Sequence, residues 1–422
     1  MKRSLILLCL LGIQLILPAQ GFNTYFYPKT LRINYIHSGT KDKDSIEVKN
    51  YQVDNLWAGS LTNLIDPNDY GCHKIMVYDV NSKQLIYSRT YSCLFGEYRT
   101  TEKGATLSKA FQETVRCPYP KNSVRIEFYT RNQYSDFEKR QEIVVHPKTI
   151  QAVPNTYQCE VMDLHIGGNY NQAYDLVIVP EGYSLADSTQ LREDLMRCKN
   201  AIIECTPFKE SAVKINIRAV LSYSEESGIS DEIRGKKVKT VVGSAFYSLD
   251  LERYLMLDHV WQLHNVCSNA PYDNIIILCN TKKYGGGGIY NWYATVSNNK
   301  HFNYVCVHEL GHTIGGLADE YYTSEVTVQD FYPKGSEPKE PNITSLVNFE
   351  SKWKNMLAPN TPIPTLITDQ NNDLLGVYEG AGYCAKGLYR PYISCTMKDI
   401  VYNKFCPVCQ KALIEMFDFY AK

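Results

Sequence analysis

Short runs in which apolar and polar residues alternate dominate the chain from Phe22 to about Ile150. Alternation with a period of two places the apolar side chains on one face of a β-strand, and turn-forming residues separate the runs. We therefore expect residues 21–150 to form an N-terminal all-β sandwich domain. The clearest runs are Leu31 to Ile36, Lys74 to Val80, Val124 to Tyr129 and Glu142 to His146.

The pattern changes after the segment Pro147 to Asn155, whose two prolines oppose regular strand pairing. Continuous apolar runs, typical of buried strands, then alternate with stretches of helical spacing. This order predicts an α/β layer within a second domain over residues 151–422. The expected strands are Leu176 to Val179, Val213 to Leu221 and Asn274 to Cys279, and the expected helices are Ser188 to Glu204 and Asp250 to Val266.

Four successive glycines lie between Tyr284 and Ile289. A phosphate-binding loop would continue with Gly-Lys-Ser/Thr, which does not follow here. The glycines therefore predict a flexible turn before the apolar run Tyr290 to Val296.

The first 20 residues have the layout of a secretory signal peptide. Lys2 and Arg3 precede the apolar run Leu5 to Leu17, and small and polar residues follow it. The run is shorter than the ~20 apolar residues of a membrane-spanning helix. We expect cleavage near Ala19 and a protein that is secreted, periplasmic or at the cell surface, without a membrane span.

Composition narrows the classes of function. Hydrophobic residues make up 44% of the chain and charged residues 21%, which indicates a packed core and not a disordered chain. The formal net charge of -1 gives no reason to expect nucleic acid or an anionic membrane as a partner. Of the 14 cysteines, Cys9 lies in the expected signal peptide, and the others would enter a compartment in which disulfides persist.

The segment His301 to Tyr322 carries the strongest candidate chemistry, because His308, Glu309 and His312 form the pattern H-E-x-x-H. Residues four apart share a helix face, so both imidazoles can reach one zinc ion at ~2.0–2.1 Å. Glu309 can take a proton from the zinc-bound water, which then attacks an amide carbonyl. The alternative is a helix whose histidines only pack or cap, but the apolar stripe of this helix and the glycines after it favour a metal site.

Zinc in a hydrolase needs a third protein ligand and one position open to water. A glycine turn after the second histidine could bring Asp319 back to the metal, as in the metzincin pattern H-E-x-x-H-x-x-G-x-x-H/D. Strict counting places the third ligand at Ala318, so one extra residue must be absorbed at Gly315 and Gly316. Glu320 and a distant glutamate are the alternatives, and we expect the unused acid to orient a histidine.

Two features further along the chain add weaker signals. Met397 lies where a metzincin would have its methionine turn beneath the metal. Tyr389, Arg390 and Tyr392 could donate hydrogen bonds to the oxyanion of a tetrahedral intermediate.

Cysteines crowd the end of the chain. Cys406 and Cys409 form a C-x-x-C motif, and Cys384 and Cys395 precede it. Such a motif marks redox centres or structural zinc in other proteins. In a secreted chain we favour disulfides.

These motifs resemble those of the secreted bacterial IgA-peptidase-type family of zinc metallopeptidases. The resemblance is strongest over residues 158–422. It rests on HELGHTIGGLADEY at His308 to Tyr321, SEESG at Ser224 to Gly228 and YRPYISCTM at Tyr389 to Met397.

The resemblance implies an α/β (α+β) metzincin-like catalytic domain preceded by a β-sandwich. It also implies His308 and His312 as zinc ligands, Glu309 as the catalytic residue and Asp319 as the third ligand. It leaves the substrate open, because cleavage of immunoglobulin A belongs to some members only.

We therefore expect a secreted zinc-dependent endopeptidase that acts on host or dietary proteins such as immunoglobulin. One alternative is a binding or adhesion protein with a degenerate peptidase domain, whose sandwich contacts a glycan or a protein. The other is a zinc amidase for a non-protein substrate. The expected partner is a protein or peptide substrate and not nucleic acid, and the oligomeric state is open.

Overall fold

The computed structural model describes residues 21–132, 135–322, 332–333, 335–400 and 404–421. The expected signal peptide, residues 1–20, lies outside the described residues. Within the described ranges, no helix is both long and apolar enough to cross a bilayer.

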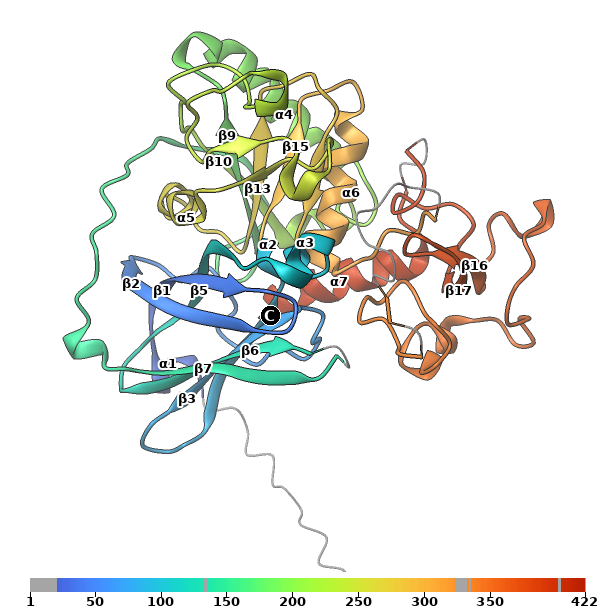
Figure 1. Cartoon of the computed structure of the whole chain (residues 1–422), viewed down its shortest axis with the longest axis horizontal. Coiled ribbons are helices and arrows are strands. Elements are labelled where there is room, and N and C mark those ends of the chain that lie inside the picture. The colour runs from blue at the N-terminus through green and yellow to red at the C-terminus, as the bar shows by residue number, and fades with distance from the viewer. Residues whose placement is uncertain (1–20, 133–134, 323–331, 334, 401–403, 422) are drawn as a thin grey trace, which may run out of the picture.

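Two antiparallel sheets form the N-terminal part (Figure 1). The sequence runs that alternate between apolar and polar residues lie on their strands, as predicted. One sheet has the order β2 (Asp44–Asp54), β1 (Phe26–Gly39) and β5 (Lys109–Pro120), and the other has the order β4 (Leu85–Tyr91), β3 (His73–Asp79), β6 (Val124–Arg131) and β7 (Phe137–Val145). Three short helices accompany them: α1 (Phe22–Tyr25), α2 (Leu94–Tyr98) and α3 (Glu102–Thr106).

The two N-terminal sheets pack face to face through buried aromatic rings. The ring of Tyr35 on β1 lies 5.5 Å from the ring of Phe128 on β6. The hydroxyl groups of Tyr35 and Tyr91, on β4, are 2.7 Å apart and share a hydrogen bond. All three side chains are buried, so the alternating pattern has produced the expected β-sandwich.

A six-stranded mixed sheet forms the second part. Its four central strands are parallel and its two edge strands are antiparallel to their neighbours. The expected strands of this part correspond to β9, β10 and β13 in the sheet order β14 (Gly286–Gly288), β15 (Ala294–Ser297), β13 (Asn274–Cys279), β9 (Tyr174–Glu181), β10 (Ile215–Val220) and β8 (Val161–Ile166).

Both faces of this sheet are buried, which explains its continuous apolar runs. On β9, Val177 and Val179 belong to the core shared with the sandwich, whereas Leu176 and Ile178 belong to the core of the opposite face. The first core includes α5 (Val260–Cys267), and the second includes α4 (Ser188–Ile203), α6 (Phe302–Gly315) and α7 (Pro407–Tyr420).

The predicted helix over Asp250 to Val266 is wrong in its first half, because α5 begins only at Val260. The backbone φ angles of Leu249 and Asp250 are +53° and +65°, which a right-handed helix cannot contain. The next residues pair with other strands, including β12 (Met256–Leu257) with β11 (Ser244–Ala245). Tertiary pairing has therefore overridden the local helical spacing.

The predicted turn at the glycine run is also wrong. Gly286–Gly288 form the edge strand β14, which pairs with β15. The outer side of β14 is partly covered, because the backbone N–H of Gly286 donates to the oxygen of Arg253 at 3.2 Å. The glycines act as a strand that neighbouring chain segments can approach closely.

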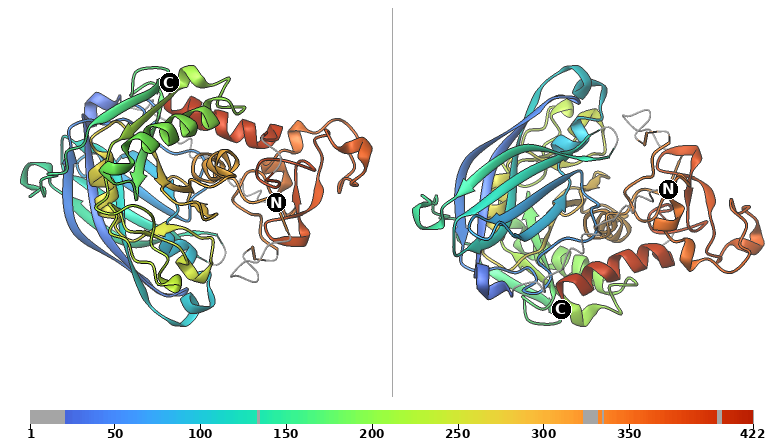
Figure 2. Two further views of the ribbon diagram at one scale, coloured as in Figure 1. Left: turned by 90° about the horizontal axis from the view of Figure 1, so that it is seen from above. Right: turned by 90° about the horizontal axis from the view of Figure 1, so that it is seen from below.

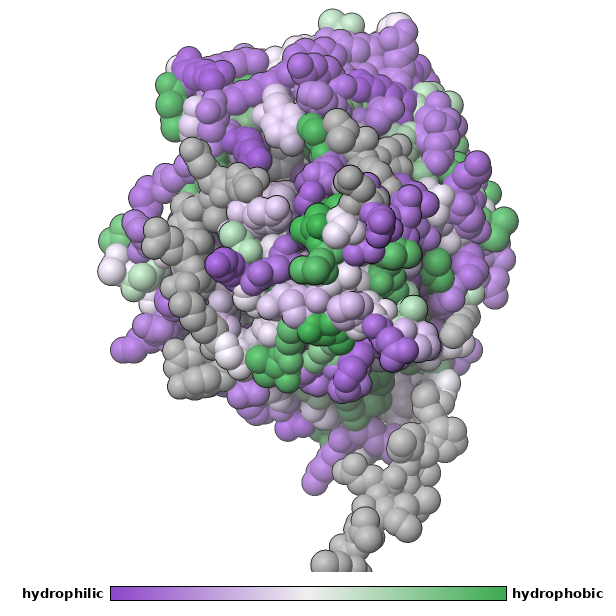
Figure 3. Space-filling model, turned by 90° about the vertical axis from the view of Figure 1, so that its right-hand side faces the viewer, coloured by the Kyte–Doolittle hydropathy of each residue, from purple (hydrophilic) through white to green (hydrophobic). Residues whose placement is uncertain are grey.

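The C-terminal segment lies on the side of α6 that faces away from the sheets. It contains the hairpin of β16 (Tyr378–Ala381) and β17 (Cys384–Arg390). In both views of Figure 2, α6 is seen end-on between the sheets and this segment. Figure 3 views the molecule from the side on which the C-terminal segment lies. This surface is mostly hydrophilic, with smaller hydrophobic groups between the hydrophilic residues.

Candidate metal centre

Helix α6 carries the H-E-x-x-H residues through the middle of the molecule. Its apolar side chains Val305, Val307 and Leu310 are buried in the core beneath the sheet. This packing fixes the rotation of the helix about its axis. His308 and His312, four residues apart, therefore project on one side, as the spacing predicted.

The helix ends at the two glycines. Its last residue is Gly315, and Gly316 has φ +59° and ψ +29°, a left-handed conformation that suits glycine. The N–H of Leu317 donates to the oxygen of Gly311 at 3.2 Å, which closes the turn. The turn absorbs the extra residue of the motif and returns Asp319 to the histidines.

Three donor atoms converge beside the helix. Asp319 Oδ1 lies 3.1 Å from His308 Nε2 and 3.3 Å from His312 Nε2. The two Nε2 atoms are 3.3 Å apart. Ligands placed ~2.0–2.1 Å from a tetrahedral ion are separated by ~3.3–3.4 Å, so this triangle has the size that a zinc ion requires.

The carboxylate of Asp319 is held so that one oxygen faces this triangle. Its Oδ2 accepts hydrogen bonds from the hydroxyl groups of Tyr321, at 2.9 Å, and Tyr383. Its buried Oδ1 has no hydrogen-bond partner in the described part of the chain. Burial favours the neutral acid, but His312 and His308 hold the pKa of Asp319 well below its usual range. An ionised oxygen is thus directed at the two imidazoles.

Backbone oxygens fix the tautomers of both histidines. His308 Nδ1 lies 2.9 Å from the oxygen of Thr396, and His312 Nδ1 lies 2.6 Å from the oxygen of Leu317. A carbonyl oxygen only accepts, so each Nδ1 carries the proton. In the neutral imidazole, Nε2 is then the atom that offers a lone pair toward the centre of the triangle, which is the form that metal binding needs.

Glu309 lies next to the triangle and does not belong to it. Its carboxylate lines a cavity of about 860 Å³ together with His308 and His312. Burial raises the pKa of Glu309, while the two histidines oppose that rise. A carboxylate whose pKa is moved toward neutral pH is suited to accept a proton.

The cavity lies between the N-terminal sandwich and the second part. One wall is formed by α6, β14 and the turn after α6, and the other by residues of the sandwich. The sandwich side contributes charged groups of both signs, among them Lys41, Glu97, Arg99, Arg131 and Arg140. Glu97 accepts a hydrogen bond from Tyr254 across the cleft.

Several residues that the sequence suggested lie away from the cavity. Tyr389, Arg390 and Tyr392 do not line it, so their predicted role at the oxyanion is wrong. Arg390 is buried, and its Nη1 donates to the backbone oxygens of Glu379 and Gly380. These bonds stabilise the hairpin and leave the guanidinium committed there.

Glu320 and Met397 have separate places. Glu320, the alternative third ligand, is turned away from the histidines, because its Oε1 contacts Asn342 Nδ2 at 3.0 Å and Cys409 Sγ at 3.3 Å. Met397 is buried under α6, where a Cβ on Gly311 would lie 2.5 Å from its Sδ. The methionine therefore packs against α6 at Gly311, the residue before His312.

The predicted disulfides near the end of the chain do not form. All cysteines in the described ranges have free thiols. Cys395 Sγ and Cys409 Sγ are 3.9 Å apart, compared with ~2.05 Å in a disulfide. The sulfur atoms of Cys395, Cys406 and Cys409 instead lie near the carboxylate of Glu320.

The groups that orient the ligands were not predicted from the sequence. Tyr321 directly follows the acidic pair of the motif, so its position was a usable signal. Tyr383 and the backbone oxygen of Thr396 lie more than sixty residues beyond Asp319. Only the folded chain brings them to the site.

Two family models match the chain. One, described as IgA Peptidase M64, matches residues 162–373 and 366–417. The other, described as Peptidase M64 N-terminus, matches residues 21–142. No curated protein matches the sequence.

Proposed function

Because the chain belongs to the IgA Peptidase M64 family, a family of metallopeptidases, we propose that it is a zinc-dependent endopeptidase. His308, His312 and Asp319 hold the zinc ion, and Glu309 is the general base. The observation that carries this proposal is the triangle of two Nε2 atoms and one carboxylate oxygen, with sides of 3.1 to 3.3 Å.

The protein residues divide the work of peptide hydrolysis. Bound zinc would polarise the scissile carbonyl and lower the pKa of water toward about 7. Glu309 accepts the proton from the attacking water and delivers it to the leaving amine. Asp319 and the two histidines keep their donor atoms in place because the phenols and backbone oxygens around them are fixed.

Protein or peptide substrates follow from the family and suit the shape of the site. The cleft lies between two parts of the molecule. It is lined by the glycines of β14, which expose their backbone, and by several tyrosines. Tyrosine offers apolar area together with a hydroxyl group, which suits contacts with a peptide. Two features support a metzincin-like relationship. One is the glycine turn that precedes Asp319, and the other is the packing of Met397 against α6.

We further propose that the protein acts outside the cytoplasm. The sequence of residues 1–20 supports export. Immunoglobulin A and other secreted host or dietary proteins are the candidate substrates.

The test compares wild type with Glu309→Ala for metal content and for hydrolysis of casein and a peptide library. We expect the variant to retain its zinc and to lose activity by at least ~100-fold, because Glu309 moves protons and is not a ligand. Glu226→Ala, at an exposed acid outside the cleft, is the matched control and should keep both.

Three other outcomes would contradict parts of this proposal. Equal activity in wild type and Glu309→Ala would refute the assignment of the base. A wild type that holds zinc but cleaves no protein would indicate an amidase for another substrate. A wild type without zinc and without hydrolysis would indicate a binding protein.

A further inference from the structure

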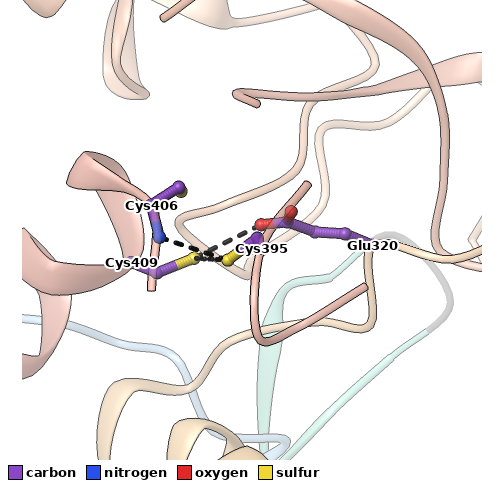
Figure 4. A group of neighbouring side chains, drawn as sticks. All are labelled: Glu320, Cys395, Cys406 and Cys409. Atoms are coloured by element: carbon purple, nitrogen blue, oxygen red, sulfur yellow. Dashed lines mark hydrogen bonds between the residues drawn. The ribbon is translucent and has the colours of Figure 1, made fainter. Parts of the chain in front are cut away.

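A second group of metal-ligating side chains lies on the other side of the Asp319 turn. All its members are buried, and their donor atoms lie within 4.8 Å of one another. Figure 4 shows that they come from three separate segments of the chain and that the sulfurs of Cys395 and Cys409 lie beside the carboxylate of Glu320. We name this group the thiol cluster, and it consists of Glu320, Cys395, Cys406 and Cys409.

The spacing within the thiol cluster fits a tetrahedral ion. Zinc–sulfur bonds of ~2.3 Å and zinc–oxygen bonds of ~2.0 Å imply S···S separations of ~3.8 Å and S···O separations of ~3.5 Å. The distance from Cys395 Sγ to Cys409 Sγ is 3.9 Å, and that from Cys409 Sγ to Glu320 Oε1 is 3.3 Å. Cys395 and Cys409 are too far apart for a disulfide, and both separations are close to those of ligands on one ion.

The carboxylate of Glu320 is an independent sign that a cation belongs here. The side chain is fully buried, with 0% of its surface exposed. Its Oε1 is contacted by Asn342 and Cys409, while its Oε2 has no hydrogen-bond partner in the described ranges. A buried carboxylate oxygen without a partner is costly, and a metal ion would remove that cost.

The backbone around the sulfurs favours thiolates. The N–H of Cys406 donates to Cys395 Sγ at 3.2 Å. Cys406 is the N-cap of α7, so both cysteines of the C-x-x-C motif lie at the positive end of a helix of 14 residues. Thiolate is the form in which cysteine binds metals.

We propose that the thiol cluster is a second zinc site, and that its role is structural. Three sulfurs and one carboxylate oxygen complete a four-coordinate shell and leave no position for water, which distinguishes it from the histidine site. Zinc is preferred over calcium or magnesium because three of the four ligands are soft sulfurs.

The two sites are joined by neighbouring residues. Asp319 of the histidine site directly precedes Glu320 of the thiol cluster. Cys395 directly precedes Thr396, whose oxygen orients His308. The N–H of Glu320 donates to the oxygen of Met397 at 2.8 Å, which ties the two segments together. An ion in the thiol cluster would therefore hold two segments in place. One carries the ligand Asp319, and the other carries Thr396, whose oxygen orients His308.

Metal counting on the full chain tests the proposal. We expect two zinc ions per wild-type chain. The double variant His308→Ala/His312→Ala should bind one ion. The double variant Cys406→Ser/Cys409→Ser should also bind one. Cys159→Ser, at a partly exposed cysteine outside both sites, should retain two.

Cobalt spectroscopy keeps the test decisive if the double cysteine variant does not fold. We expect the His308→Ala/His312→Ala protein loaded with Co²⁺ to show intense near-ultraviolet thiolate-to-cobalt charge-transfer absorption. Because this variant lacks the histidine site, the readout does not depend on peptidase activity, and failure of the proposed function would leave it unchanged.

Two results would overturn the second site. One is a wild type with a single zinc ion and no charge-transfer absorption with cobalt. The other is an intact mass, measured without reductant, that is two hydrogen masses low with a disulfide mapped within the thiol cluster.

Discussion

The Nδ1 atom of His308 lies 2.9 Å from the backbone oxygen of Thr396, although the two residues are 88 positions apart in the chain. Because the carbonyl oxygen can only accept, His308 is held in the tautomer whose Nε2 faces Asp319. Thr396 adjoins Cys395 of the thiol cluster. The orientation of a predicted zinc ligand thus depends on a segment far along the chain from the H-E-x-x-H motif.

Asp319→Ala should remove one zinc ion from the protein, because it deletes one of three donor atoms and leaves two partly buried phenols without their acceptor. We expect the apparent zinc affinity of the histidine site to fall at least ~100-fold. A competition titration with a chelator measures this. Asp163→Ala, at a carboxylate that is 66% exposed, is the control. Full zinc affinity in Asp319→Ala would assign the third ligand to another acid.

Tyr383→Phe should weaken zinc binding without removing a ligand. Its hydroxyl donates to Asp319 Oδ2 and so keeps Oδ1 directed at the histidines. The loss of such an outer partner typically costs ~10–100-fold in metal affinity or activity. Tyr170→Phe, at an exposed tyrosine, should change neither. Unchanged affinity in Tyr383→Phe would mean that Tyr321 alone suffices.

Gly288→Ala should destabilise the active-site cleft. A Cβ at this position would lie 2.5 Å from the backbone oxygen of Glu309 and 3.1 Å from its Oε2, so β14 and α6 would have to move apart. We expect a loss of ~1–3 kcal/mol in the free energy of unfolding, together with reduced activity. Thermal or denaturant unfolding measures the first and casein hydrolysis the second.

Gly168→Ala is the matched control for that substitution. The nearest atom to its Cβ would be 3.6 Å away, an ordinary contact. Its stability should stay within ~0.5 kcal/mol of wild type. Equal stability of the two alanine variants would show that the spacing between β14 and α6 is not constrained by glycine.

Zinc binding should depend on pH through His312. Burial alone would lower the pKa of His312, but Asp319 and Glu309 raise it to about 9 in the metal-free protein. Below that pH the imidazole must release a proton before it can bind zinc. The apparent affinity should therefore rise about tenfold per pH unit for each proton released as pH rises toward 9. Calorimetry at pH 7 in buffers of different ionisation enthalpy should detect at least one released proton.

The same pKa predicts the stability of the chelated protein. A histidine whose pKa rises on folding from its ordinary value of 6.5 to about 9 stabilises the fold below pH 6.5, and this stabilisation is lost as pH rises to 9. The melting temperature of chelated protein should accordingly fall over that range relative to zinc-loaded protein. A constant difference between the two forms would contradict the linkage.

Much of the architecture could be predicted from local patterns. The strands around Tyr35 and Phe128 followed from alternation, and β13 from its continuous apolar run, because burial on one or two faces leaves a direct record in the sequence. The first half of the Asp250 to Val266 helix could not be predicted, since pairing with distant strands outweighed helical spacing. The turn predicted at the glycine run was wrong for the same reason, because these glycines pair with β15.

For this protein, the order of residues alone determined the chemistry offered by α6: two imidazoles one helical turn apart, an adjacent carboxylate, and a glycine turn that returns an acid. Helix periodicity and backbone geometry are local, so a sequence can specify them. Only the tertiary structure decided that Asp319 faces the histidines while Glu320 joins three cysteines. Those choices depend on which distant side chains fill each side of the turn, and contacts between distant segments arise only when the chain packs.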